Sequence, residues 1–326
     1  MTLMDGFRGA PIGGFAYVKK DGTPNAVPVT PFVADDRIVI TSTLTYVTKA
    51  AAVRRDPRVA LLAGGSHVAS TGSVVVDETP TWFNRNIRDD EITKFPPTWH
   101  FLGIPFHECL FPWYSGHVLI DFEPATIEPA QGGDRVTVAS LDHEGRLLIT
   151  PLAAEVTEAT DGITTSGVTD GPAVVLVHEE HDDMADLRQL ALAGMVRRGV
   201  FTVSSRRGSL APTPTGTRAQ LSAIRSMAKL ARANRGLVSD WPHLQASEGH
   251  RRSPFGPITR RDPKSISTGP PKWRTTSLGA TTTTEDWSGT RPFELGMRAR
   301  RCGGADQEQH HRDTATHPTD KVVQQA

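Results

Sequence analysis

The chain has 326 residues, of which 37% are apolar, and its 36 basic and 36 acidic side chains give a formal net charge of zero. This balance argues against a nucleic-acid partner for the folded part, and no apolar run approaches the ~20 residues that span a bilayer. Two cysteines, Cys109 and Cys302, and the absence of a basic-then-apolar export signal favour a cytoplasmic protein.

The first quarter of the chain predicts antiparallel strands joined by short turns. Runs rich in β-branched residues predict strands at 14–20, 26–33, 37–43 and 58–63. A turn at Asp21-Gly22 pairs the first two strands, and Asp35-Asp36 pairs the second with the third. A helix is expected over 45–55, ending at Asp56-Pro57 because the residue before proline avoids the α region.

Further elements follow as far as residue 127. A strand is expected at 68–76, where Gly72 indicates a bend or a close approach by a ligand or neighbouring strand. A helix is expected at 79–94 and a strand at 117–127. The fold class is therefore mainly β: a barrel with short helices.

The helix predicted at 45–55 begins beside the end of a hydroxyl-rich strand. Thr41 and Ser42 end that strand, and Thr48 and Lys49 open the helix. Hydroxyl groups, free N–H groups of a helix start and an ammonium are suited to holding a phosphate. The alternative is that Lys49 is a solvated surface residue and the threonines are merely good strand formers.

This order of motifs resembles the pyridoxamine 5′-phosphate oxidase-like, FMN-binding split-barrel family. The resemblance lies in Asp21-Gly22-Thr23-Pro24, Val27-Pro28-Val29, Thr41-Ser42-Thr43, and Lys49 followed by Arg54-Arg55-Asp56-Pro57-Arg58-Val59-Ala60-Leu61. It covers roughly the first 130 residues well and the next 75 loosely.

The resemblance implies an FMN-dependent oxidoreductase that acts on a small organic substrate by hydride transfer at the flavin. The phosphate would lie at Thr41, Ser42, Thr48 and Lys49, and the flavin ring would face Pro28, Val29 and Thr30. Trp113 is an aromatic residue just before a predicted strand, a position suited either to lining a flat ring site or to covering the end of the barrel. Catalytic residues are not assigned. Two alternatives remain open: an F420-dependent reductase on the same fold, and a non-catalytic flavin- or haem-binding protein, with His107 or His117 as the haem candidate. Such barrels usually form homodimers with the cofactor at the interface.

Residues 129–206 are expected to form a degenerate second barrel-like unit after a flavin-binding unit at 1–128. The turn segment 139–145 aligns with 16–22, and 161–163 aligns with 36–38. The predicted strand at 173–178 aligns with 59–64, and the one at 192–203 aligns with the strand that contains Gly72. The copy has no room for a helix between Gly167 and Pro172, and it lacks a lysine there. It therefore cannot rebuild the phosphate site, and an intrachain pseudo-dimer could replace the homodimer.

The rest of the chain carries fewer functional signals. Residues 207–238 are expected to be a linker and a basic amphipathic helix (217–236) that covers its own domain, and residues 239–326 a disordered tail. Histidines and acids occur at His100, His107, Cys109 and His117 and at 178–183, but their spacings match no tetrahedral zinc pattern. No metal site is predicted.

Overall fold

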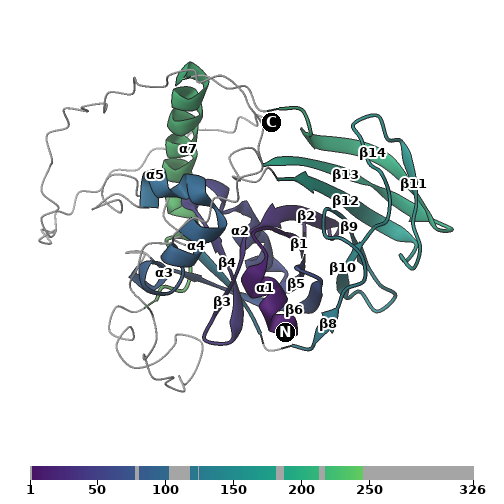
Figure 1. Cartoon of the computed structure of the whole chain (residues 1–326), viewed down its shortest axis with the longest axis horizontal. Coiled ribbons are helices and arrows are strands. Elements are labelled where there is room, and N and C mark those ends of the chain that lie inside the picture. Colours follow the sequence, from purple (N-terminus) through teal and green to yellow (C-terminus); the bar gives the residue numbers. More distant parts are fainter. Residues whose placement is uncertain are drawn as a thin grey trace, which may run out of the picture. The chain divides into compact units, whose positions relative to one another are not determined.

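The computed structural model describes residues 2–77, 81–102, 118–123, 125–180, 187–212 and 217–244 (Figure 1). These residues form two antiparallel sheets with a few short helices, which confirms the mainly β fold class. None of the helices within these ranges is long and apolar enough to cross a membrane. Trp113, His107, His117 and most of the predicted disordered tail lie outside the described residues.

The first sheet is a split barrel whose two halves share one long strand, β6 (Ser66–Val76). The strand order is β2-β1-β5-β6-β7-β4-β3, and β8 also pairs with β6. The first part of β6 pairs with β5 and its second part with β7, so the sheet turns at β6 and both halves face one apolar core. The other strands are β1 (Gly13–Val18), β2 (Pro24–Val29), β3 (Pro31–Ala34), β4 (Arg37–Ser42), β5 (Arg58–Ala63), β7 (Val118–Phe122) and β8 (Ile127–Pro129).

The strand predicted at 26–33 is in fact two strands, and this prediction is corrected. β2 ends at Val29 and pairs with β1, whereas β3 begins at Pro31 and pairs with β4. Proline has no N–H to donate, so Pro31 is placed where the chain leaves one ladder and enters the next. Thr30 is therefore the residue at which the chain passes from one half of the barrel to the other.

Helix α2 (Thr48–Arg55) contributes Ala50, Ala52 and Val53 to the core of the barrel. It follows a 3₁₀ turn, η1 (Leu44–Tyr46), and it ends at Asp56 as predicted. A β-carbon at Gly72 would lie 2.9 Å from a methyl group of Val53 on α2 and 3.0 Å from one of Val59 on the neighbouring strand β5, so both a helix and a strand approach this position closely.

The second sheet repeats the strand order of the first. Its order is β10-β9-β12-β13-β14-β11, and the order in the first sheet is β2-β1-β5-β6-β7-β4. The two orders match when β9, β10, β11, β12, β13 and β14 are taken as the counterparts of β1, β2, β4, β5, β6 and β7. β3 and β8 of the first sheet have no counterpart in the second, and no helix lies between β11 and β12 among the described residues, as predicted. The strands are β9 (Val136–Leu141), β10 (Leu147–Pro151), β11 (Gly162–Thr164), β12 (Gly171–Glu179), β13 (Arg188–Arg197) and β14 (Val200–Ser209).

The two sheets pack against each other through equivalent faces. β12 packs on β2, and its counterpart β5 packs on β10, the counterpart of β2. In the same way, β9 contacts β2, and its counterpart β1 contacts β10. The buried layer includes Ala26 and Leu62 from the first sheet with Ile149 and Leu176 from the second. A β-carbon at Gly14 would come within 2.9 Å of Ile149 Cδ1 and 3.0 Å of Thr137 Oγ1, so side chains of the second sheet pack directly on the backbone of β1. Such reciprocal contacts are the signature of a two-fold interface, here within one chain.

Three other predicted elements differ from those observed. The strand at 192–203 is the hairpin β13–β14, which turns at Arg198 and Gly199 with φ of 52° and 75°. The helix at 79–94 is two helices, α3 (Thr81–Asn86) and α4 (Arg88–Lys94), because Ile87 leaves the helical conformation. The strand at 117–127 is divided between β7 and β8.

Helix α7 (Thr217–Val238) packs on η1, and the chain after it returns to the barrel. Trp241 is buried in the barrel core, and Val76 exchanges backbone hydrogen bonds with Pro242 and Leu244. Residues 239–244 are thus packed on the barrel, and the predicted disordered tail does not begin at residue 239. Divisions between domains at residues 128 and 206 remain predictions.

Candidate functional site

The predicted cofactor residues gather where β2 passes into β3 and where β4 passes into α2. Pro31 is paired with Ile40 in the β3–β4 ladder. Thr30 immediately precedes Pro31 and Thr41 immediately follows Ile40, so both residues flank the last pair of this ladder. Both are half-buried. Two hydroxyl-bearing residues from separate segments are thus brought together.

Ser42 is occupied by local structure. Its hydroxyl donates to the backbone oxygen of Tyr46 at 2.9 Å and lies 3.2 Å from that of Thr43. The side chain is buried and holds the 3₁₀ turn that leads into α2. A phosphate ligand would therefore compete with this bond for the Ser42 proton, and the predicted role of Ser42 in binding is not tested.

Thr43 is part of the hydroxyl-rich strand end but is not among the predicted cofactor-binding residues. Its Oγ1 is shielded from solvent and has no hydrogen-bond partner within the described ranges. A buried hydroxyl without a partner costs about 1–3 kcal/mol. An acceptor brought by a ligand would relieve that cost.

Lys49 lies in the first turn of α2, one residue after the exposed Thr48. The side chain is half-buried, and burial lowers the pKa of its ammonium to about 8, an effect opposed by the nearby carboxylate of Glu91. The first N–H groups of a helix point along its axis, out of its N-terminal end, and favour an anion there. Lys49 is thus a cation placed in the same turn as several backbone donors.

The three residues expected to face a flavin ring lie along the last part of β2. Val29 is buried in the barrel core, while Pro28 and Thr30 are half-buried. Pro28 is paired with Gly14, on which Ile149 and Thr137 of the second sheet pack. The structure therefore places Pro28 and Thr30 beside the meeting of the two sheets.

Helix α4 brings two charged residues to this region that the sequence analysis missed. The ammonium of Lys94 donates to the backbone oxygens of Pro31 and Phe7, at 2.5 and 3.2 Å, and lies 5.2 Å from the ring centroid of Phe32. Its side chain is 5% exposed, and burial lowers its pKa while Asp90, at 3.6 Å, opposes that shift. Lys94 thus fixes α4 to the residue that follows Thr30.

Glu91 lies one helical turn before Lys94 and is half-buried. Burial raises the pKa of its carboxyl to about 7, and the charge of Lys49 opposes the shift. Residues three apart lie on the same side of a helix, so Glu91 and Lys94 share one side of α4. The segment from Arg88 to Lys94 offered only its helical periodicity as a signal, and nothing in it pointed to Lys49.

Helix α7 holds the 3₁₀ turn that precedes Lys49. Asn234 Nδ2 donates to the backbone oxygen of Leu44 at 2.9 Å, and Thr45 Oγ1 donates to that of Met227 at 3.1 Å. Tyr46 Oη lies 3.6 Å from the Met227 sulfur. The basic helix expected to cover its own domain thus covers the turn beside the candidate phosphate site.

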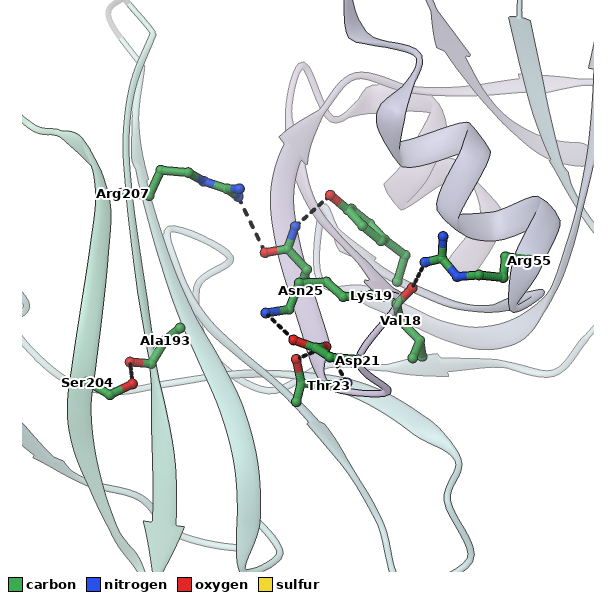
Figure 2. Close-up of polar contacts among 10 residues, drawn as sticks. Val18, Lys19, Asp21, Thr23, Asn25, Arg55, Ala193, Ser204 and Arg207 are labelled. Atoms are coloured by element: carbon green, nitrogen blue, oxygen red, sulfur yellow. Dashed lines mark hydrogen bonds and ion pairs between the residues drawn. The ribbon is translucent and has the colours of Figure 1, made fainter. Parts of the chain in front are cut away.

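A polar contact joins the two sheets near the β1–β2 hairpin. Figure 2 shows Arg207 reaching from β14 to Asn25 on β2, with 3.3 Å between Arg207 Nη2 and Asn25 Oδ1. Asn25 in turn donates to the hydroxyl of Tyr17 at 2.5 Å. Burial raises the pKa of that phenol. Asn25 lies at the start of β2, away from Pro28 and Thr30, so we assign this contact to the packing of the sheets.

The histidines and acids considered as metal ligands do not form a cluster within the described residues. His178 is buried on β12, and its Nε2 lies 2.9 Å from the backbone oxygen of Asp134. No set of three or more His, Cys, Asp or Glu in the described ranges is placed to hold a metal ion. His107, Cys109 and His117 lie outside those ranges.

Comparisons with known proteins give structural likenesses only. No protein-family profile and no curated protein matches the chain. A pyridoxamine 5′-phosphate oxidase-related, FMN-binding protein from Nostoc punctiforme is 10% identical, with a TM-score of 0.28, over 47% of this chain and 93% of its own. An F420 reductase is 19% identical, with a TM-score of 0.27, over 36% of this chain and 88% of its own. The haem storage protein HutZ from Vibrio cholerae is 11% identical, with a TM-score of 0.28, over 40% and 95%. Likenesses at this level do not indicate which residues act in this chain.

Proposed function

We propose that the chain binds FMN through its phosphate at Lys49 and acts as a flavin-dependent oxidoreductase on a small organic substrate. The observation that supports the proposal is the position of Thr30 and Thr41 on either side of the last β3–β4 pair, with Lys49 in the first turn of the helix that follows β4. These residues come from three separate segments. A set of hydroxyl groups and an ammonium beside a helix start is suited to a phosphate.

The residues present fit a phosphate group. Thr43 offers a buried hydroxyl without a partner among the described residues, and no described residue forms a hydrogen bond to the Lys49 ammonium. Pro28 and Thr30 would lie against the ring, and Lys94 keeps the adjoining Pro31 in place through its backbone oxygen. The protein would thus bind and orient the cofactor at the junction of its two sheets.

The flavin, when bound, supplies the hydride chemistry. The chain's part is to hold the phosphate, to shield one face of the ring by β2, and to exclude water through the packing of the second sheet on the first. We assign no residue to proton transfer with the substrate. Coenzyme F420, whose tail also carries a phosphate, remains an alternative for the same residues.

Titration of the purified chain with FMN, riboflavin, F420 and haem tests the proposal. We expect FMN to bind more tightly than riboflavin, and we expect Lys49→Ala to remove that difference while Lys20→Ala, an exposed lysine on the β1–β2 turn, leaves it unchanged. Binding of haem alone, or of no cofactor, would contradict the proposal. Oxidation of a nicotinamide cofactor or of reduced F420 would then distinguish an enzyme from a carrier.

A further inference from the structure

Helix α7 is attached to the barrel along one side of its surface. The residues on this side are spaced by four, three and four positions, and they are Met227, Ala231, Asn234 and Val238. Ala231 and Val238 are buried in the barrel core, whereas the side chains of Met227 and Asn234 contact the 3₁₀ turn η1. Residues with this spacing lie on one side of a helix, so the other sides of α7 are turned away from the barrel.

A second line of residues on α7 is small or apolar, and it is exposed. It repeats the same spacing one residue earlier in the chain, at Ser226, Leu230, Ala233 and Leu237. All four side chains are exposed, and those of Leu230 and Leu237 are 51% and 46% exposed. One residue corresponds to about 100° of rotation about the helix axis, so this line, which we call the seam, lies about a quarter turn from the barrel contact.

The seam is bordered by cations that have no counter-charge. One residue earlier again, and with the same spacing, come Arg225, Lys229 and Arg232, all of which are exposed. None of them forms an ion pair or a side-chain hydrogen bond with another residue in the ranges that the structure describes. No acidic residue occurs between Thr217 and Val238. An acidic partner would therefore be attracted to this border of the seam.

The charges argue against two occupants that this chain itself could provide. The α7 helix of a second copy would bring cations against cations, because α7 contains no acid. The residues after 244 carry more basic than acidic side chains, so on average α7 would repel them as well. The complementary charge must come from another molecule.

The seam indicates which class of anionic molecule fits. Nucleic acid contacts cations through its phosphates and has no apolar line to place on leucines. A bilayer favours a wide face of large apolar side chains, whereas Ser226 and Ala233 are small. Large residues alternating with small ones, spaced by four and three, are the pattern on which a second helix packs, with its own side chains between them.

We propose that α7 docks an acidic amphipathic helix of another protein. The apolar residues of that helix lie on the seam, and its carboxylates lie opposite Arg225, Lys229 and Arg232. The inference does not depend on the proposed function, because no residue of the seam or its border belongs to the candidate phosphate site.

A synthetic acidic peptide tests the proposal on the full-length chain. The probe is a fluorescein-labelled peptide of about three heptads, with leucine at positions a and d and with glutamate and alanine elsewhere. A scrambled peptide of the same composition keeps the charge and loses the apolar line. We expect fluorescence anisotropy to show binding of the ordered peptide about tenfold tighter than that of the scrambled one. No binding of the ordered peptide, or equal affinity for both, would overturn the proposal.

Substitutions on α7 locate the docking face. We expect Leu230→Gln combined with Leu237→Gln, and separately Arg232→Glu, each to weaken binding of the ordered peptide about tenfold. Arg235→Glu is the matched control. Arg235 is exposed on the other flank of the barrel contact, one residue after Asn234, so we expect a change of less than about twofold. All of these positions are exposed, and circular dichroism checks that each variant is folded. Equal weakening by Arg232→Glu and Arg235→Glu would contradict the assigned face.

Two further titrations distinguish the other anionic partners. Phosphatidylglycerol vesicles that bind more tightly than the ordered peptide, and lose binding when both leucines are replaced, would show that the face serves a lipid surface. Duplex DNA that binds more tightly than the peptide, and is insensitive to the leucine substitutions, would show a nucleic-acid surface. Either result would overturn the proposal, and neither bears on FMN binding, which is measured separately.

Discussion

Asn234 of α7 donates a hydrogen bond of 2.9 Å to the backbone oxygen of Leu44, in the turn that leads to Lys49. The same amide lies 3.4 Å from the oxygen of Thr45. Helix α7 therefore fixes a turn that lies 190 residues earlier in the chain. Since that turn positions the start of α2, α7 supports the candidate phosphate site without contributing a ligand to it.

We predict that Asn234→Ala weakens FMN binding severalfold and lowers the free energy of unfolding by about 1 kcal/mol, the usual net value of one hydrogen bond. The reason is that the turn at Leu44 loses its tether while Lys49 itself is unchanged. Arg235→Ala, at the exposed neighbouring position, is the control. Fluorescence titration and urea unfolding measure the two effects. An Asn234→Ala variant with unchanged FMN affinity would show that α7 does not support the site.

The packing of the two sheets predicts that they unfold together. Leu176 of β12 is fully buried in the layer between the sheets. Leu176→Ala should lower the free energy of unfolding by about 2–5 kcal/mol, through lost apolar contact and the cavity left behind. Leu237→Ala, at a 46% exposed position on α7, should cost far less. Circular dichroism and tryptophan fluorescence should report one coincident transition, and two separated transitions would show that the sheets are independent.

The reciprocal packing of the sheets also predicts that the chain is a monomer. The face of the first sheet that includes Ala26 and Leu62 is already buried against the second sheet, so it is not available to another copy. The intrachain pseudo-dimer then takes the place of the homodimer that the family resemblance implies. Sedimentation equilibrium should give the mass of one chain, 35.3 kDa, at micromolar concentration. A mass of two chains would refute this prediction.

Asp121 predicts a dependence of stability on pH. Its side chain is fully buried on β7 and paired with Arg37 of β4, and burial raises its pKa to about 7 against the opposing effect of Arg37. A carboxyl group with a raised pKa binds its proton more tightly in the folded state. Its contribution is therefore present at low pH and is lost as the pH rises from about 4, the unfolded value, to about 7.

Asp121→Asn should flatten this slope, because an amide does not titrate. Urea unfolding at several pH values between about 4.5 and about 7.5 measures the slope of the unfolding free energy with pH. Asp89→Asn is the control, because the side chain of Asp89 is 93% exposed. Asp121→Ala, which leaves Arg37 without this carboxylate, should cost about 3–5 kcal/mol. An Asp121→Asn slope equal to that of the original chain would show that Asp121 does not titrate in this range.

Some of the fold could be predicted because local signals agreed with tertiary structure. Asp35 and Asp36, with φ of 51° and 58°, form the tight turn expected between two strands, and Pro57 follows the end of α2. The internal repeat was also visible, since aligned turn residues mark strands that have the same pairing order in both sheets. These features depend on residues close together in sequence.

Other features could not be predicted because their signals were weak or distant. Arginine is rarely found in the left-handed conformation of a turn, so the sequence predicts one strand where the structure has the β13–β14 hairpin with Arg198 in its turn. The break at Thr30 lay inside a continuous run of strand-forming residues. The mutual effect of Glu91 and Lys49 on their pKa values depends on the tertiary fold, which no local pattern records.

The absorbance spectrum of the chain purified without added cofactor, compared with that of Lys49→Ala, tests the central claim most directly. The account predicts the bands of an oxidised flavin in the original chain and their loss or marked weakening in the variant. Flavin bands of equal strength in both would contradict the phosphate site at Lys49. A sharp Soret band in place of flavin bands would contradict the flavin itself.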